Sequence, residues 1–433
     1  MNTMMPPLKK NQTMTSRERI RTVLAHREAD RLPMDFGSTA VTGLHVSCVA
    51  ALRKHYGLPE HPVAVIEPYQ LLGEVERDLR DALGIDTMTV LPPKNLFGFS
   101  NDRWREWRAP WGQDLLVPGD FVTQPAPDGG LHIFPGGDTS VPASGHLPAT
   151  GYFFDTIIRQ EPIDEDNLKV EDNLEEFGAF NDGDVAHFRE AAKAAAASGK
   201  AVVATIGGTA FGDIALVPAP FLKRPRGIRD IEEWYVSISE RPDFVRSIFE
   251  KQCEIALANL AKVAAATGDN IDVVFLCGTD FGTQISQFCS VKTFREVYQP
   301  YYRAVNDWIH QHTNWKTMKH TCGAVRPLIP ELIAAGFDIL NPVQCSAIGM
   351  EPEGLKKDFG DQVTFWGGGV DTQKTLPFGT PAQVREEVLS RCEIFSPGGG
   401  FVFNSIHNLQ ALTPTANLVA MFEAVREFNG NHA

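Results

Sequence analysis

The chain has 433 residues, and its 54 acidic residues outnumber the 40 basic ones, which gives a formal net charge of −14. This acidic balance argues against a nucleic-acid-binding protein, because phosphate contacts need clustered Lys and Arg. The hydrophobic fraction of 43% is enough for a full core and excludes intrinsic disorder.

The first fifth of the chain, to about residue 91, mixes helices with two short strands. Residues 1–14 are expected to form a disordered tail, and a capping-box pattern, Thr15-x-x-Glu18, then opens a helix. The pattern next predicts a strand at 32–36, helices at 41–55 and 68–83, and a strand at 86–91. Gly84 marks the end of the second of these two helices.

The middle of the chain, from about residue 92 to 184, is punctuated by Pro and Gly, which favours short antiparallel strands and predicts a β-rich or irregular insertion. After it, strands and helices alternate. The strands are expected at 201–206, 272–277, 316–320, 338–341, 363–366 and 401–404. The helices are expected at 186–197, from 228, at 242–266, 292–312, 325–335, 351–359 and 380–392, and from 413.

The strands number eight, and most are closely followed by a helix, which indicates repeated βα units with parallel strands. Eight strands favour a closed barrel over an open doubly wound sheet, and no GxGxxG follows the first strand to suggest dinucleotide binding. The sequence therefore predicts an α/β protein, a single (β/α)8 TIM barrel over residues 15–430 with the insertion at about 92–184.

The location of the protein is predicted from what the sequence lacks. No apolar run reaches the roughly 18 residues that cross a bilayer, and the N-terminus has no apolar signal-peptide region. The seven cysteines are odd in number and form no CxxC pair, which fits a reducing compartment. We expect a cytoplasmic protein that binds neither membrane nor nucleic acid.

Active-site groups of such barrels lie just past the C-terminal ends of the strands. The polar residues at those positions are Asp35, Asp280, His320, Cys322, Gln344, Cys345, Asp371, Asn404 and His407. Each alone is a weak indication, because Asp and Asn after a strand are more often turn formers than catalysts.

The pair His320-x-Cys322 is the most specific of these patterns. Residues i and i+2 at a strand end point the same way, so an imidazole and a thiolate converge on one point. Nitrogen and sulfur ligands suit zinc, whereas a polar His beside a buried, inert Cys is the alternative. A zinc site open to substrate needs a third protein ligand, for which Cys345, His407 and Asp280 are the candidates.

Four segments, HTCG (320–323), NPVQ (341–344), TFWGGGVDTQ (364–373) and FNSIHN (403–408), resemble the uroporphyrinogen decarboxylase superfamily. The resemblance covers about residues 15–428 and is to the branch of zinc-dependent methyltransferases that act with corrinoid proteins. It implies a (β/α)8 barrel in which a His-x-Cys pair and a distant Cys bind zinc, which activates a thiol or other methyl acceptor. His320 and Cys322 match the pair.

Two positions depart from the patterns of the superfamily. The distant Cys lies in a PG-Cys-G stretch, where this chain has Gly399 in PGGG (397–400), so Cys345 or His407 would have to replace it. True decarboxylases carry an arginine-bearing segment after the first strand, where this chain reads DFGST from Asp35 without arginine. An octa-anionic tetrapyrrole needs compensating cations, so this absence disfavours porphyrinogen decarboxylation.

The resemblance thus implies a metal-dependent methyltransferase or demethylase that moves a methyl group between a small methylated substrate, a thiol or a corrinoid. The side chains expected to bind zinc are His320 and Cys322, with Cys345 or His407 as the third. Those expected to act on substrate are Asp280, Gln344 and Asp35. A corrinoid carried by a partner protein and a homodimer are also implied. The alternatives are cofactor-free uroporphyrinogen decarboxylation and a non-catalytic corrinoid- or tetrapyrrole-binding protein.

Overall fold

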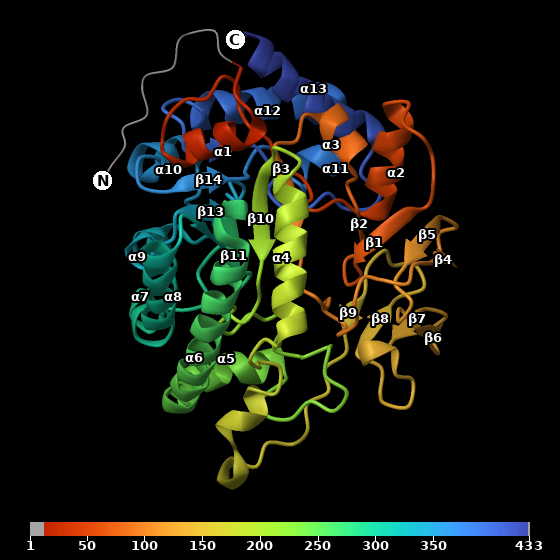
Figure 1. Cartoon of the computed structure of the whole chain (residues 1–433), viewed down its shortest axis with the longest axis vertical. Helices are drawn as coiled ribbons and strands as arrows, with labels where there is room; N and C mark the ends of the chain where they lie inside the picture. The colour runs from red at the N-terminus through yellow and green to blue at the C-terminus, as the bar shows by residue number, and fades with distance from the viewer. Residues whose placement is uncertain (1–12, 432–433) are drawn as a thin grey trace.

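A curled sheet of parallel strands forms the centre of the computed structural model, which describes residues 13–431 (Figure 1). Its seven strands run in the order β15-β14-β13-β12-β11-β10-β3. They are β3 (Thr87–Val90), β10 (Ala201–Thr205), β11 (Val273–Cys277), β12 (Lys316–His320), β13 (Ile339–Asn341), β14 (Thr364–Trp366) and β15 (Phe401–Val402). The predicted α/β architecture with a parallel sheet is confirmed.

The eighth predicted strand, at 32–36, is reduced to a single parallel bridge between Met34 and Phe403. On this side Phe403 donates its N–H to Pro33 at 2.9 Å, and Asp35 donates its N–H to Phe403 at 3.0 Å. On the other side Asp86 donates its N–H to Met34 at 2.8 Å. The segment thus joins the two edges of the seven-stranded sheet. Pro33 has no N–H to donate, which shortens the ladder.

Helices cover the outside of the sheet (Figure 1). They are α4 (Asp182–Ala196), α5 (Ile231–Glu240), α6 (Pro242–Thr267), α7 (Val291–Thr293), α8 (Gln299–His312), α9 (Ile329–Ala334), α10 (Pro352–Phe359), α11 (Thr375–Phe378), α12 (Pro381–Phe395) and α13 (Thr415–Asn431). The predicted helix at 292–312 is interrupted by a π-helical turn, Phe294–Tyr298, between α7 and α8. Pro300, which lacks a backbone N–H, lies in the first turn of α8.

Helix α1 (Ser16–Leu24) lies at the amino-terminal ends of the strands (Figure 1). Its N-cap Thr15 forms the predicted capping box with Glu18. The apolar side chains of α1, which are Ile20, Val23 and Leu24, pack with the inward-facing side chains of the sheet. These are Ala201, Val203, Val273, Met318, Ile339, Trp366 and Val402. Because side chains alternate along a strand, His320 points the same way as Met318, one layer closer to the carboxyl end.

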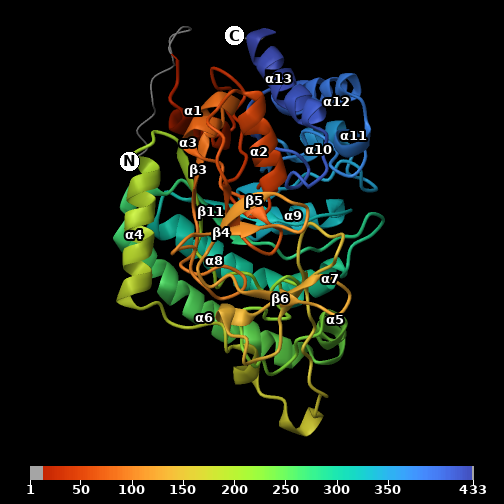
Figure 2. The same ribbon diagram turned by 90° about the vertical axis from the view of Figure 1, so that its right-hand side faces the viewer.

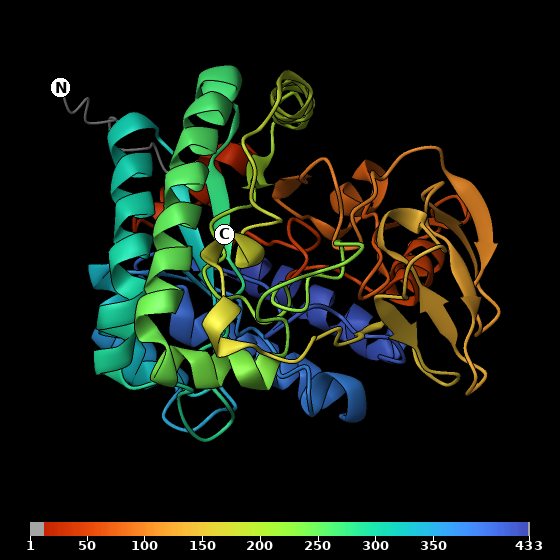
Figure 3. The same cartoon turned by 90° about the horizontal axis from the view of Figure 1, so that it is seen from below.

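Two small four-stranded sheets lie to one side of the central sheet, on the right in Figures 1 and 3 and facing the viewer in Figure 2. Their orders are β2-β1-β5-β4 and β6-β7-β8-β9. The strands are β1 (Val63–Glu67), β2 (Leu72–Gly73), β4 (Arg105–Arg108), β5 (Asp114–Val117), β6 (Thr123–Pro125), β7 (Leu131–Ile133), β8 (Gly145–Leu147) and β9 (Asp155–Thr156). The region 92–184 therefore contains six short strands, and β1 and β2 join them from earlier in the chain.

The first predicted helices need correction. Residues 68–83 are not one helix but β2 followed by a shorter α3 (Arg77–Leu83). Gly73 packs closely on β1, since a β-carbon there would lie 2.6 Å from Val63, and this contact overrides the helical spacing. Helix α2 (Val46–His55) begins five residues after the predicted start at residue 41. The His45 side chain caps it by accepting the Ser47 N–H.

All seven cysteines are free thiols. No helix in the described part of the chain has the length and apolar character needed to cross a membrane. The predicted tail, residues 1–14, lies outside the described residues except for its last two.

Candidate metal centre

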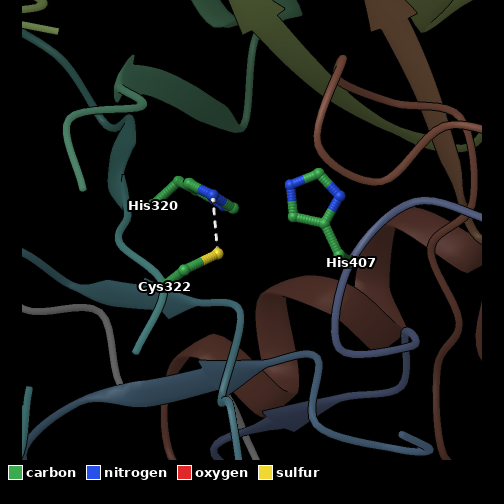
Figure 4. Close-up of side chains that lie close together, drawn as sticks. All are labelled: His320, Cys322 and His407. Carbon is green, nitrogen blue, oxygen red and sulfur yellow. Dashed lines mark hydrogen bonds between the residues drawn. The ribbon is translucent and has the colours of Figure 1, made fainter. Parts of the chain in front are cut away.

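His320 and Cys322 lie at the carboxyl end of β12 and turn their side chains toward each other (Figure 4). The Cys322 Sγ lies 3.5 Å from the His320 Nε2. The chain turns at Gly323, which has a φ of 91°. Only Gly fits at this position, because a β-carbon there would lie 2.3 Å from the backbone of Gly282. Strand alternation and this turn are enough to bring the pair together locally.

His407 reaches the same point from the loop that follows β15. One ligand atom from each of His320, Cys322 and His407 lies within 4.8 Å of the other two. The two imidazole rings are 5.3 Å apart and inclined by 77°, and Figure 4 shows a ring nitrogen of His407 directed toward the pair. Within residues 13–431 this is the single group of three or more His, Cys, Asp or Glu side chains that lie close enough to share a metal ion.

The hydrogen bonds of His320 assign its tautomer. Its Nδ1 lies 2.6 Å from the Oδ1 of Asn341, while the Nδ2 of Asn341 donates to the Trp366 carbonyl at 2.7 Å. The amide oxygen therefore faces the ring, so Nδ1 carries the proton and Nε2 keeps its lone pair. That lone pair is on the side of Cys322, which is the arrangement of a metal ligand oriented by a neighbouring acceptor.

Burial keeps all three side chains neutral when no cation is bound. It lowers the pKa of His320 to about 4, an effect that Asp280 opposes and His407 adds to. Burial also lowers the pKa of His407. Burial and then the charge of Asp280 raise the pKa of the Cys322 thiol well above its usual value. The imidazoles are thus ready to bind a metal, whereas the Cys322 thiol has to lose its proton to solvent when a metal binds.

The donor atoms of this group fit zinc. Two imidazole nitrogens and one sulfur are ligands that zinc binds in proteins. Three protein ligands leave the fourth tetrahedral position for water or substrate, which is the pattern of catalytic rather than structural zinc sites.

Two of the residues predicted to act on substrate border the group. Asp280 Oδ1 accepts the Cys322 N–H at 2.7 Å and lies 3.7 Å from His320 Nε2, and 29% of its side chain is exposed. Gln344 is buried, and its Oε1 accepts the Gly323 N–H at 2.6 Å. Asp280 therefore presents a carboxylate at the site, while Gln344 supports the turn that carries Cys322.

The third such residue, Asp35, is not brought to the group. Its fully buried carboxylate accepts hydrogen bonds from Ser38 Oγ at 2.6 Å, Thr87 Oγ1 at 2.6 Å and Trp366 Nε1 at 2.9 Å. These bonds tie the segment around Met34 to the neighbouring strands. Because all three of these hydrogen-bond donors belong to the protein, we interpret Asp35 as a structural rather than a catalytic residue.

Cys345, the other candidate thiolate, does not join the group either. Its Sγ lies 3.4 Å from the Val343 carbonyl and 4.0 Å from the Gly368 carbonyl, and burial raises its pKa to about 12. Of the candidates for a third ligand, His407 is the one that completes the group.

The PGGG stretch at 397–400 lies at the opposite end of β15 from His407, because it precedes that strand. Gly399 has a φ of 75°, and a β-carbon there would lie 2.4 Å from the Arg27 carbonyl. The lack of a thiol at Gly399 therefore removes no ligand from the group at the carboxyl end.

Two residues that the sequence analysis did not single out hold the histidines. Asn341 is the register partner of His320 across β12 and β13, and Asn408 lies 2.9 Å from His407 Nδ1 through its Oδ1. Asn408 could have been found from the sequence, because it directly follows the candidate ligand His407. Asn341 is found only once the strand register is known.

The curled parallel sheet and the group at its carboxyl end define a barrel-type α/β protein with a candidate metal centre. Residues 156–428 match the family described as uroporphyrinogen decarboxylase (URO-D). The match spans more than half of the chain, which therefore belongs to the uroporphyrinogen decarboxylase family, as its motifs predict. No curated protein matches the sequence significantly.

Among solved structures, a methyltransferase from Methanosarcina mazei has a similar fold. The TM-score is 0.53 at 16% identity, over 96% of this chain and 99% of that chain. At this identity the likeness concerns the fold alone. A D-psicose 3-epimerase solved in the presence of D-fructose gives a TM-score of 0.33 at 11% identity, over 57% of this chain and 82% of that chain.

Proposed function

We propose that this protein is a zinc-dependent methyltransferase or demethylase that moves a methyl group between a small methylated substrate, a thiol or a corrinoid. The observation that carries the proposal is the convergence of His320, Cys322 and His407 within 4.8 Å at the carboxyl ends of β12 and β15. Family membership and the methyltransferase among its structural neighbours are in keeping with this activity.

His320, Cys322 and His407 would hold the ion, and a fourth position would remain for the substrate. Bound zinc lowers the pKa of a coordinated thiol, so that a thiolate is available at neutral pH. In the transfer, the substrate thiol would first lose its proton to solvent, and the thiolate sulfur would then bond to the methyl carbon while the donor–methyl bond breaks and leaves its electron pair on the donor.

The neighbouring residues position these groups. Asn341 keeps the His320 Nε2 lone pair free for the ion, and Gln344 fixes the turn that carries Cys322. Asp280, which is partly exposed beside His320, accepts a hydrogen bond from the substrate and aligns it. The proposal includes a corrinoid carried by a partner protein, a homodimeric enzyme and a cytoplasmic location.

The first test is the zinc content of the purified protein and its activity with methylcobalamin and a series of small thiols. We expect about one zinc per chain and thiol methylation, both lost in His320→Ala, Cys322→Ala and His407→Ala. Loss of the cobalt–carbon absorbance reports the transfer.

A protein without zinc, whose rate is unchanged by His320→Ala, would refute the proposal. Conversion of uroporphyrinogen to coproporphyrinogen without metal would instead identify a decarboxylase. Tight cobalamin binding without turnover would identify a binding protein.

A further inference from the structure

Asn408 is fully buried beside His407, and both polar atoms of its side chain have hydrogen-bond partners. Its Oδ1 lies 2.9 Å from His407 Nδ1 and also accepts a hydrogen bond from Gln410 Nε2. Its Nδ2 donates to Gln70 Oε1 and, at 3.3 Å, to the Ala40 carbonyl. The amide is thus held from both ends.

This arrangement assigns the tautomer of His407. Because the Nδ2 of Asn408 faces two acceptors, its Oδ1 faces the ring, and an oxygen without a proton has to accept there. The Nδ1 of His407 therefore carries the proton, and its Nε2 keeps the lone pair that a metal would bind. Asn408 does for His407 what Asn341 does for His320.

The two supports come from different parts of the fold. The Asn341 amide is oriented by the Trp366 carbonyl, within the central parallel sheet. The Asn408 amide is oriented by Gln70, which lies in the turn between β1 and β2 of the added small sheet.

The turn that presents Gln70 is itself closed by hydrogen bonds. The Glu67 carboxylate accepts the N–H of Tyr69 at 3.0 Å and the N–H of Gln70 at 2.8 Å. A local ring of this kind limits the conformations of the turn and keeps the Gln70 amide against Asn408.

We propose that Asn408 and Gln70 are positioning residues of the metal centre, so that the small sheet β2-β1-β5-β4 is part of the machinery that keeps His407 ready to bind zinc. The inference rests on the proposed function, because it takes His407 as a zinc ligand. Its consequence is that substitutions in a sheet outside the region matched to the family, 156–428, weaken metal binding.

The test compares Asn408→Leu, Asn408→Asp and Gln70→Ala with a matched control, Asn417→Leu. Asn417 is also a buried Asn, but its Nδ2 donates to the carbonyls of Leu376 and Gly379, outside the metal centre. Zinc affinity is measured by competition with a chromogenic chelator, and folding by circular dichroism.

We expect zinc binding to weaken by about 10- to 100-fold in Asn408→Leu and less in Gln70→Ala, as for other residues that orient metal-bound histidines. Asn408→Asp keeps an acceptor for the His407 Nδ1–H but loses the Nδ2 donor to Gln70 and to the Ala40 carbonyl. That variant should therefore bind zinc more tightly than Asn408→Leu. Asn417→Leu should lose stability but keep its zinc affinity.

A second measurement needs no variant at position 408. Nitrogen-15 NMR of the metal-free protein, with the His407 signals assigned through His407→Gln, should show the Nδ1–H tautomer. This readout holds even if the wild type binds no zinc, an outcome that would refute the proposed function alone.

Three results would overturn the positioning proposal. One is wild-type zinc affinity in a folded Asn408→Leu, another is equal weakening in Asn408→Leu and Asn417→Leu, and the third is an Nε2–H tautomer of His407.

Discussion

The carboxylate of Asp280 is bonded to the backbone of Cys322, whose N–H it accepts at 2.7 Å, and it lies 3.7 Å from the Nε2 of His320. One side chain from the loop after β11 thus touches both members of the His-x-Cys pair. Burial is the larger cause of the raised pKa of the Cys322 thiol and of the lowered pKa of His320; the negative charge of Asp280 adds to the first shift and opposes the second. Asp280 is therefore placed to stabilise a cation held by the pair.

Asp280→Asn tests this electrostatic part, because the amide oxygen still accepts the Cys322 N–H while the charge is lost. We expect zinc to bind about tenfold more weakly, a change of about 1.4 kcal/mol that a screened charge at this distance accounts for. Asp280→Ala also loses the hydrogen bond and should bind zinc more weakly still. Equal zinc affinity of Asp280→Asn and the wild type in a chelator titration would show that the charge does not act on the ion.

Cys345→Ala separates the two candidate thiolates. The Cys345 Sγ contacts backbone carbonyls and does not belong to the group of three. We expect its removal to leave the zinc content and the zinc affinity unchanged, and to cost about 1 kcal/mol of stability for the lost, partly buried sulfur atom. A zinc content as low as that of Cys322→Ala, measured by elemental analysis, would contradict the arrangement described above.

Lys319 is a fully buried cation directly before His320. Its Nζ donates to the carbonyls of Thr279 and His320 and lies over the ring of Phe281, 5.0 Å from the centroid. It thereby links the loop after β11 to the end of β12.

Lys319→Met keeps the aliphatic packing but leaves both carbonyls without this donor. We expect the free energy of unfolding to fall by about 2–4 kcal/mol, at roughly 1–2 kcal/mol for each buried acceptor. The urea midpoint measures the loss, and Lys292→Met, at an exposed position, serves as the control. Equal urea midpoints for the two variants would show that Lys319 does not stabilise the fold by linking the loop after β11 to the end of β12.

Burial raises the pKa of Glu67 to about 7, although the N–H groups of Gln70 and Tyr69 act against this shift. From pH 4.5 to about 7 the folded protein therefore keeps a proton that the unfolded chain has released. The stability from this group is present at low pH, falls as pH rises through that window and is constant above it.

Glu67→Gln removes this titration. We expect the melting temperature of the variant minus that of the wild type to increase between pH 5.5 and pH 8. Taking the difference cancels the contribution of the buried histidines, which titrate in both proteins. A difference that is the same at both pH values would show that Glu67 is ionised throughout.

The elements after residue 184 could be predicted from the sequence because their apolar spacing and their end signals are local. Thr380 and Pro381 start α12 as expected, and the strands that end at Cys277, His320, Asn341 and Trp366 end where predicted. The segment at 68–83 could not be predicted, because a short apolar run that contains Gly73 suits a strand or a helix until its partner strand is known. The predicted strand at 32–36 survives only as a bridge, since Pro33 cannot donate to it.

The sequence by itself determined two of the three side chains of the candidate metal centre. His320 and Cys322 share a strand end at a spacing of two residues, and Gly323 turns the chain, so their approach depends only on local geometry. Only the tertiary structure decided the rest. His407, rather than Cys345 or a residue in PGGG, completes the group because the loop after β15 is folded against the turn of the small sheet. The protonation of both rings depends on Asn341 and Asn408, whose orientations are set by carbonyl groups distant in the sequence.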